Sequence, residues 1–418
     1  SSYITPEISA RTVGSLLRWP MIPVIHDSPK FKKYAMIKPL THIAGISVEQ
    51  FMKEDWHTKP RLFRQAFPDF EPLCDLETIA EMASDEDIES RLIQHNKTGW
   101  TLEHGPFDEL PSMKKKAWTV LVQGIDHHLP EAYDLLQLFR FIPDARLDDV
   151  MLSLASDGGG VGPHYDSYDV FLLQMHGKRQ WKIGPLANRE LEEGVPLKIL
   201  KNFTPTEEFL LEPGDMLYLP PGYGHDGVAQ GTCSTLSIGF RAPTQAEVLG
   251  GILRDMADLI DSNPDMQSKL FADPGRGTQQ SPAEIPDDML TFGLNLFTEF
   301  SRKTPEIQRS MGCLLTEPKP HVYFVNNTED QEIHEIISVL GDRGIALSMK
   351  TKMLFKGGVF FINGELVNPT NDLTVKQLQM LANQREMDPS DAAEALKNPE
   401  FQYFLIGFAK AGWVETLM

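Results

Sequence analysis

The chain has 418 residues, enough for two or three domains, and 41% of them are hydrophobic, as is usual for a globular protein. Its net charge of -20 argues against general affinity for nucleic acid or for anionic membranes, and suits a basic protein partner better. Three cysteines without a CxxC pair disfavour zinc-cysteine sites and disulfide frameworks, and no apolar run is long enough to span a membrane, so we expect a cytoplasmic protein.

The N-terminal part of the chain is predicted to be mostly helical. Residues 1–40 lack a signal-peptide hydrophobic region and are dotted with proline, so we expect a loosely ordered leader over residues 1–45. Residues 47–56 have the pattern of an amphipathic helix that begins at the cap residue Ser47. Residues 75–95 and 108–140 are also predicted to be mainly helical, with starts at Asp75 and Ser84.

Asp126, His127 and His128 form a sequence that could be interpreted as a metal site. Adjacent histidines face different directions on a helix and on a strand. We therefore expect them to be surface residues near a helix end.

The pattern changes to short strands separated by Gly and Pro turns after Leu147. The expected strands are 148–154, 168–175, 179–183, two within 208–219, and 234–240. His176-Gly177 is predicted to be the turn of a hairpin, and Pro213-Gly214-Asp215 a tight turn between two strands. Short strands without intervening helices favour a closed or sandwiched antiparallel sheet, and the whole chain is expected to be α+β.

Helical patterns return after Pro243, over residues 247–260 and 283–313. Four apolar residues recur at helical spacing in the second segment: Phe292, Leu296, Phe297 and Phe300. Such a stripe usually lies in a core, and a helical dimer interface is the alternative.

Residues 316–418 combine helices with a hairpin-rich stretch around Leu354–Ile362 and the turn Asn363-Gly364, which resembles a winged helix. This segment has 14 Asp and Glu against 9 Lys and Arg. A nucleic-acid reader needs a basic face, so we expect a structural or protein-binding role and no direct nucleic-acid binding.

One glycine-rich segment, Gly158 to Asp166, delivers His164 and Asp166 two residues apart. Alternate residues of an extended chain point to the same face, so both can reach one metal ion. His225, after the Pro220-Pro-Gly loop, is the candidate third ligand. Two histidines and one carboxylate are the ligand set of non-haem Fe(II) oxygenases.

Four segments together resemble the bacterial ribosomal oxygenases of the Jumonji-C (JmjC) type, in the cupin superfamily: Gly159–Phe171, Gly177–Trp181, Leu211–Gly222 and Ser237–Pro243. The resemblance implies a double-stranded β-helix with helical N-terminal elements. It further implies a JmjC oxygenase domain over residues 46–243, a helical dimerisation region over 244–315 and a winged helix over 316–418. The implied activity is hydroxylation of an arginine side chain on a large-subunit ribosomal protein, by a homodimer.

The resemblance also implies the cofactors. His164, Asp166 and His225 would hold Fe(II), with 2-oxoglutarate and O2 as co-substrates. Arg179 stands where this family has a basic residue, and a guanidinium suits the distal carboxylate of 2-oxoglutarate. Lys178 should point to the other face of the strand.

The strand before the glycine-rich bend places Asp149, Met151, Ser153 and Ala155 on one face, and packing residues on the other. An acid at 149 suits a cationic substrate side chain, and an aromatic ring beside a guanidinium is attractive. The resemblance assigns substrate binding to Asp149, Met151, Tyr168 and Ser237.

Two other functions remain open at this point. A JmjC protein demethylase would use the same domain on methyl-lysine, and an acid at Asp149 suits either cation. A non-catalytic cupin scaffold, with a winged helix that binds a partner, is the second alternative.

Overall fold

The structure, a computed structural model, describes residues 37–67, 69–278, 281, 283–326, 328 and 331–417. Residues 1–36 of the expected leader lie outside the described residues. Residues 37–45 are described, and Ile43 is 1% exposed within the main core. It lies in β1 (His42–Ile43), which pairs with β2 (Ile46–Ser47).

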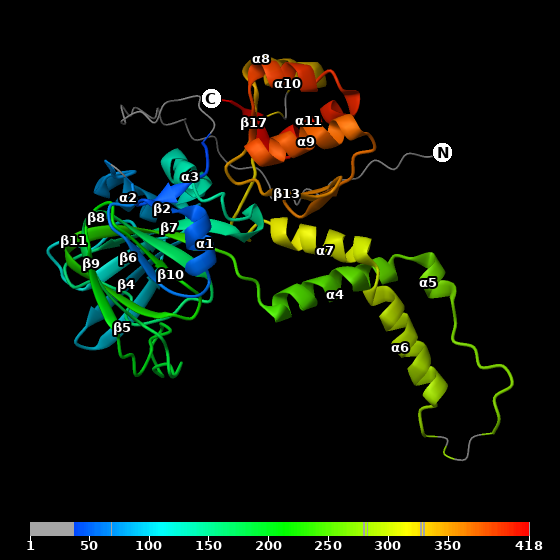
Figure 1. Cartoon of the computed structure of the whole chain (residues 1–418), viewed down its shortest axis with the longest axis horizontal. Helices are drawn as coiled ribbons and strands as arrows, with labels where there is room; N and C mark the ends of the chain where they lie inside the picture. Colours follow the sequence, from blue (N-terminus) through cyan, green and yellow to red (C-terminus); the bar gives the residue numbers. More distant parts are fainter. Residues whose placement is uncertain are drawn as a thin grey trace. The chain divides into compact units, whose positions relative to one another are not determined.

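The largest sheet is antiparallel and has nine strands (Figure 1). The strand order is β3-β10-β8-β11-β7-β6-β4-β5, and β9 pairs with β8 beside this path. The strands are β3 (Arg61–Phe63), β4 (Ser90–Asn96), β5 (Gly99–His104), β6 (Trp118–Val122), β7 (Leu147–Ala155), β8 (Asp169–Gly184), β9 (Glu207–Leu211), β10 (Met216–Leu219) and β11 (Gly224–Phe240).

The hairpin expected at His176-Gly177 is wrong. The chain continues through Gly177, at φ 60°, as the 16-residue strand β8. This strand pairs antiparallel along its length with the 17-residue strand β11, and the register of the pair shifts between Gln230 and Thr235. A bulge at this place bends both strands, so the Gly signal marked a bend inside one long strand. The turn at Pro213-Gly214-Asp215 does separate β9 from β10, as expected.

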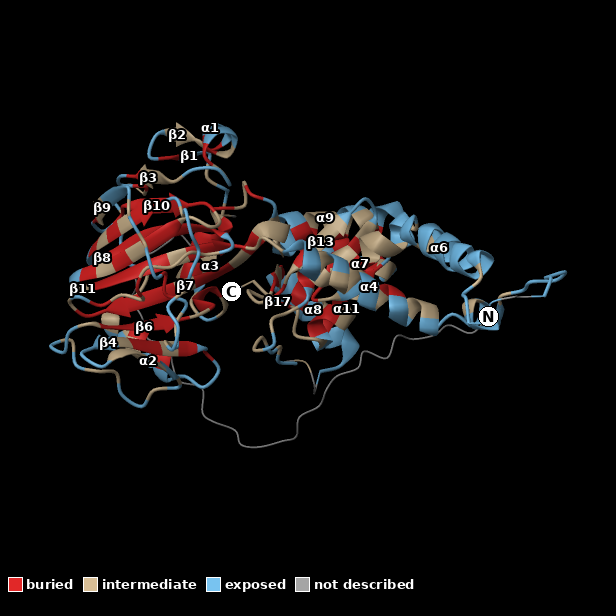
Figure 2. Cartoon of the chain, turned by 90° about the horizontal axis from the view of Figure 1, so that it is seen from below, coloured by how far each residue is buried: buried red, intermediate tan, exposed pale blue. Residues whose placement is uncertain are grey.

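The main core lies on one face of β7. Val150, Leu152 and Leu154 are at most 1% exposed and belong to the same buried cluster as the aromatic residues Phe171 and Phe240. The strands of the large sheet are mostly red in Figure 2. The helices of this half of the chain are α1 (Val48–Glu54), η1 (Ile125–His127), α2 (Leu76–Ser84), α3 (Pro130–Gln137) and η2 (Asp144–Arg146). The packing face predicted for the strand over 148–154 is therefore confirmed.

Ser47 caps α1 as predicted, since its hydroxyl accepts a hydrogen bond from the backbone N–H of Gln50. Asp75 caps α2 in the same way. Helix is wrong for 90–96 and for 118–122, which are β4 and β6, and Ser84 ends α2 instead of starting a helix. In β6 every residue from Trp118 to Val122 is buried, so alternation of polar and apolar residues is absent there.

Four helices follow the large sheet: α4 (Gln245–Asp261), α5 (Pro264–Ser268), α6 (Asp287–Ser301) and α7 (Thr304–Thr316). None of the described residues of α6 is buried, and the helix is pale blue along most of its length in Figure 2. Phe292 is 37%, Leu296 39% and Phe297 63% exposed. The apolar stripe is therefore not part of a core within this chain.

The C-terminal residues have a core of their own, around Phe360, Leu378 and Phe401. Asn363-Gly364 is the predicted turn, with φ 48° and 88°. The elements are α8 (Ile333–Arg343), β12 (Ile345–Leu347), β13 (Met353–Lys356), β14 (Val359–Ile362), β15 (Glu365–Val367), α9 (Asp372–Gln384), β16 (Glu386–Met387), α10 (Pro389–Ala395), α11 (Pro399–Lys410) and β17 (Val414–Thr416). Throughout the described part of the chain, no helix has the length and apolarity needed to cross a membrane.

Candidate active site

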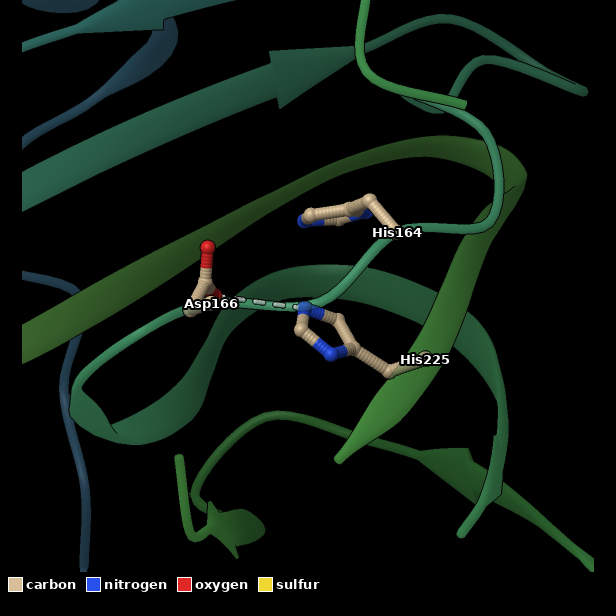
Figure 3. A group of neighbouring side chains, drawn as sticks. All are labelled: His164, Asp166 and His225. Atoms are coloured by element: carbon tan, nitrogen blue, oxygen red, sulfur yellow. Dashed lines mark ion pairs between the residues drawn. The ribbon is translucent and has the colours of Figure 1, made fainter. Parts of the chain in front are cut away.

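His164, Asp166 and His225 lie together at one end of the large sheet (Figure 3). One ligand atom from each lies within 4.8 Å of the other two. His164 and Asp166 come from the glycine-rich loop between β7 and β8, and His225 comes from the start of β11. Among the described residues this is the one group of His, Cys, Asp and Glu with such spacing.

The glycines of this loop permit a close approach to neighbouring chain segments. A side-chain carbon at Gly160 would lie 2.5 Å from the carbonyl oxygen of Gly227, on β11. At Gly162, where φ is +77°, it would lie 2.6 Å from Ile199. Larger residues would push the loop away from β11, so the glycines hold His164 and Asp166 near His225.

Backbone carbonyls orient both imidazole rings. Nδ1 of His164 lies 2.9 Å from the Gly162 carbonyl oxygen, and Nδ1 of His225 lies 3.0 Å from the Tyr223 carbonyl oxygen. A carbonyl is an acceptor, so each Nδ1 carries the proton and each Nε2 has its lone pair free for a metal. The donor set and its orientation therefore fit a divalent metal ion.

The pKa values of His164 and Asp166 suit metal binding, whereas a metal ion would have to displace the proton that Asp166 favours on Nε2 of His225. Burial, with a further contribution from His225, lowers the pKa of His164 to about 4, so this ring is neutral at pH 7. Burial opposes charge on His225 too, but Asp166, 3.4 Å from its Nε2, outweighs burial and raises the pKa of His225. Burial would likewise raise the pKa of Asp166, but its interactions with His225 and His164 lower it, so this carboxylate is ionised.

Arg179 lies on the interior face of β8, 4% exposed, and its Nε donates to Sγ of Cys233 at 3.4 Å. No hydrogen-bond partner for its Nη2 is present among the described residues. Lys178 pairs instead with Glu212 on the other face, as predicted. A buried guanidinium with an unpartnered nitrogen is suited to an anionic ligand.

Two further buried donors lack hydrogen-bond partners within the described ranges, Oγ1 of Thr119 and Nε1 of Trp181. Thr119 on β6 is directly opposite Ala155 on β7, and Ala155 is opposite Cys233 on β11. On the other side of β11, Ala229 is opposite Arg179 on β8. Opposed residues on neighbouring antiparallel strands share one face. Thr119 and Arg179 therefore face the same floor of small buried residues, formed by Ala155, Ala229 and Cys233.

Trp181 extends this face toward the metal cluster. It is two residues after Arg179 on the same strand, and its ring centroid lies 5.9 Å from that of His225. The interior face therefore leads from Thr119 and Arg179, past Trp181, to a candidate metal ligand. The buried guanidinium of Arg179 and the candidate metal ligand His225 thus both lie close to the Trp181 ring.

The four residues predicted to bind substrate come from three neighbouring elements. Met151 on β7 is directly opposite Ser237 on β11. Asp149, two residues before Met151, is 5% exposed. A side-chain carbon at Gly239 would lie 3.6 Å from Oδ1 of Asp149 and 3.9 Å from Cε2 of Tyr168. Asp149 and Tyr168 therefore meet above Gly239.

Tyr168 links this face to the metal cluster along the chain, two residues after Asp166, and contributes to lowering the pKa of the Asp166 carboxyl. Burial raises the pKa of Tyr168 itself, so the hydroxyl keeps its proton. Its side chain remains 36% exposed. The structure thus places all eight predicted site residues on β7, β8 and β11 or in the loop between β7 and β8.

Comparison with known proteins identifies two domains. A JmjC domain matches residues 134–248, and a ROXA-like winged helix matches residues 303–415. The chain is 27% identical to the ribosomal protein uL16 3-hydroxylase of Escherichia coli K12 over 368 residues, covering 87% of this chain and 96% of that protein. The chain therefore carries a JmjC domain and a ROXA-like winged helix, and it is similar over most of its length to ribosomal oxygenases.

A solved structure of YcfD, a ribosomal oxygenase from E. coli in complex with cobalt and 2-oxoglutarate, aligns with a TM-score of 0.77 and 26% identity, covering 88% of this chain and 97% of that one. The expected fold, an α+β chain with a cupin-type β-helix and a winged helix, is confirmed. A shorter match, 39% over 85 residues, is to the bifunctional lysine-specific demethylase and histidyl-hydroxylase NO66 of Dictyostelium discoideum, covering 19% of this chain and 16% of that protein.

The surface position predicted for Asp126 in this JmjC homologue is wrong. Asp126 is 2% exposed, and its Oδ1 accepts a hydrogen bond from the backbone N–H of Val150 at 2.8 Å. His128 is exposed, as expected. The burial of the Asp126 carboxylate could not be predicted from the sequence. The group that donates a hydrogen bond to it, the backbone N–H of Val150, lies on β7, and no local sequence pattern indicates that contact.

Sequence reasoning missed three residues of this site: Thr119, Gln123 and Lys319. Gln123 and Lys319 both donate to Oδ2 of Asp149. Thr119 lies in the apolar run Trp118 to Val122, where no alternation marks the face on which its side chain lies. Lys319 follows α7, distant in sequence from Asp149, and has no signal of this kind.

Proposed function

We propose that this protein is an Fe(II)- and 2-oxoglutarate-dependent oxygenase that hydroxylates an arginine side chain of a large-subunit ribosomal protein. The observation that carries the proposal is the buried carboxylate Asp149, which lies next to Gly239 together with Tyr168, two residues after the candidate metal ligand Asp166. An acid suited to a cationic side chain is thus linked to the candidate metal cluster through a short stretch of chain.

His164, Asp166 and His225 are assigned as the ligands of Fe(II). The bound metal would supply O2 activation, coupled to oxidative decarboxylation of 2-oxoglutarate to succinate and CO2, with one oxygen atom inserted into a substrate C–H bond. Arg179 binds the distal carboxylate of 2-oxoglutarate, and the Thr119 hydroxyl donates to the same carboxylate. The support is the pair of buried unpartnered donors and, in the homologue, a complex with cobalt and 2-oxoglutarate.

The substrate face orients the target side chain. Asp149 accepts hydrogen bonds from the guanidinium, the Tyr168 ring lies against its plane, and Met151 and Ser237 line the side of the pocket. Holding one C–H bond near the metal is the protein's main contribution to rate. Lys319 and Gln123 occupy only Oδ2 of Asp149, and a charged donor to the remaining carboxylate oxygen makes a stronger hydrogen bond than a neutral one, so a cationic substrate side chain is favoured over a neutral imidazole.

The test uses purified enzyme with Fe(II), 2-oxoglutarate and recombinant uL16, the protein on which the E. coli relative acts. Peptide mass spectrometry should find one added oxygen atom on one arginine, with succinate formed in equal amount. Modification of a histidine, or loss of a methyl group from a methyl-lysine peptide with release of formaldehyde, would support the demethylase or histidine-hydroxylase alternatives. Absence of any 2-oxoglutarate turnover would support the non-catalytic scaffold.

We further propose that the protein is a homodimer in which a second copy covers the apolar face of α6. Leu290, Leu294 and Phe297 of this helix are 52%, 67% and 63% exposed. An unpartnered face of this kind marks an interaction site. Analytical ultracentrifugation should give twice the chain mass, and Leu294→Asp with Phe297→Asp should give the monomer mass; a monomeric native protein contradicts the proposal.

The winged helix is proposed to bind protein instead of nucleic acid, because residues 316–418 have five more acidic than basic side chains. The proposed domain limits, 46–243, 244–315 and 316–418, enclose most of the two matched ranges. Addition of duplex DNA or of RNA hairpins should leave the fluorescence anisotropy of a labelled protein unchanged at physiological salt.

A further inference from the structure

The two oxygens of the Asp149 carboxylate have different environments. Oδ2 accepts hydrogen bonds from Nζ of Lys319 and from Nε2 of Gln123, each at 2.8 Å. No described residue donates to Oδ1, which is the oxygen that faces Gly239 and Tyr168. Two hydrogen bonds therefore fix Oδ2 of this buried carboxylate, whereas Oδ1 is available to accept hydrogen bonds on the substrate face.

Both donors to Oδ2 are themselves fixed. Nη2 of Arg91 donates to Oε1 of Gln123 at 3.1 Å, which directs the amide NH2 group of Gln123 toward Asp149. Nζ of Lys319 also contacts Oδ1 of Asp148 at 2.9 Å. Lys319 comes from the segment between α7 and α8, outside the large sheet. A residue that follows the helical region thus reaches the acid on β7.

The charges around Asp149 require such a cation. Asp126 on η1 and Asp148 on β7 are acids close to it, and His127 is neutral because burial lowers its pKa to about 3. Tyr168 keeps its proton. Burial alone would raise the pKa of Asp149, but Lys319 outweighs this and keeps the carboxylate ionised. Removal of Lys319 would leave the buried Asp149 without its charged hydrogen-bond donor, while Lys352 would still interact with Asp148 and Asp126.

We propose that Lys319 is a positioning residue for substrate binding: it holds Asp149 by Oδ2 so that Oδ1 is presented, ionised, to the cationic side chain of the substrate. This inference rests on the proposed function, since it assigns the substrate to the free oxygen of the same acid. It gives the segment that leads into the winged helix a part in building the substrate site of the JmjC domain.

A competing arrangement makes the opposite prediction. If Lys319 occupied the place of the substrate cation, its removal would free Asp149 and tighten substrate binding. If Lys319 only attached the C-terminal residues to β7, loss of a different contact between those residues and β7 would weaken substrate binding by the same factor. Lys352 provides that control, because its Nζ donates to the Leu147 carbonyl oxygen at 3.0 Å, at the start of β7, without contacting Asp149.

The experiment compares full-length wild-type protein with the variants Lys319→Met, Lys319→Arg and Lys352→Met. KM and kcat for recombinant uL16 are measured by mass spectrometry with Fe(II) and 2-oxoglutarate. Binding of 2-oxoglutarate to the Co(II)-loaded protein is measured by calorimetry, as a readout independent of turnover. We expect Lys319→Met to raise the KM for uL16 by about tenfold or more, since a charged hydrogen bond that orients the acid is lost.

The same variant should leave the affinity for 2-oxoglutarate within about twofold of wild type, which shows that the metal site is folded. Lys319→Arg should restore most of the substrate KM, and Lys352→Met should leave it unchanged. An unchanged or lowered KM in Lys319→Met, or an equal rise in Lys352→Met, overturns the positioning role alone. If the wild-type protein modifies no arginine of uL16, the proposed function fails and this inference fails with it.

Discussion

His164 and His225 exchange two backbone hydrogen bonds, and in each the N–H of one residue donates to the carbonyl oxygen of the other at 2.9 Å. This isolated antiparallel bridge joins the loop after β7 directly to β11. Because the backbones hold the two residues together, the spacing of the side chains does not depend on a bound metal. The site is therefore formed in advance.

Replacement of a candidate metal ligand should abolish metal binding without unfolding the protein. We expect His164→Ala and Asp166→Ala to lose Co(II) binding by at least about 100-fold, because each removes one of three protein ligands while the bridge between the backbones of residues 164 and 225 remains. Calorimetric Co(II) titration checks the loss, and circular dichroism checks the fold. His128→Ala, which removes an exposed histidine, is the control. Full Co(II) affinity in either ligand variant contradicts the assignment.

Arg179→Met should weaken binding of 2-oxoglutarate by about tenfold to 100-fold, because the buried cation for its distal carboxylate is lost. Lys178→Met is the matched control, since its ammonium group pairs with Glu212 on the opposite face. The 2-oxoglutarate KM in the uncoupled reaction, without protein substrate, measures the effect. A KM that is equal in the two variants would assign the carboxylate to another residue.

Thr119→Val should weaken binding of 2-oxoglutarate by about threefold to tenfold, because it removes one neutral donor and keeps the shape of the side chain. The ligand-free protein should be as stable as wild type or more stable, because its buried hydroxyl has no hydrogen-bond partner among the described residues. Thermal unfolding with and without 2-oxoglutarate separates the two effects. A variant that loses stability in the absence of ligand would show that the hydroxyl is structural.

Asp126 should make the protein less stable as the pH rises. Burial, with a further contribution from Asp149, raises the pKa of Asp126 to about 7 in the folded protein. At pH values between the pKa of Asp126 in the unfolded chain and its pKa in the folded protein, the folded state binds more protons than the unfolded state. The free energy of unfolding therefore falls as the pH increases from about 4 to about 7. The expected change is on the order of 3 kcal/mol.

Asp126→Asn is the test of this dependence, since its side-chain oxygen can still accept from the Val150 N–H. Urea unfolding at several pH values should give a flatter profile for the variant than for wild type over this range. Identical profiles would mean that Asp126 is ionised in the folded protein at neutral pH.

The sequence was sufficient to predict the metal cluster, because glycine-rich turns and a His-x-Asp spacing are local signals. The resemblance pointed to Arg179, and strand alternation then placed Lys178 on the opposite face. The strand over 148–154 was predicted because Val150, Leu152 and Leu154 recur at every second position.

Other features depend on contacts that no local pattern records. Trp118 to Val122 form a strand buried on both faces, so alternation was absent and helix was predicted. Gly177 was interpreted as a hairpin turn because a glycine with positive φ is typical both of a turn and of a bend within a strand. In this structure it marks a bend within β8. The pairing of Lys319 with Asp149 joins residues far apart in the chain, and the burial of Asp126 depends on the Val150 N–H.

The central claim is tested most directly by mass spectrometry of ribosomal proteins from cells with the gene, without it, and with the His164→Ala variant in its place. We predict that one arginine-containing peptide of a large-subunit protein gains the mass of one oxygen atom only in cells that carry the wild-type gene. Identical ribosomal peptide masses in all three strains, under aerobic growth with the protein present, would contradict the proposal.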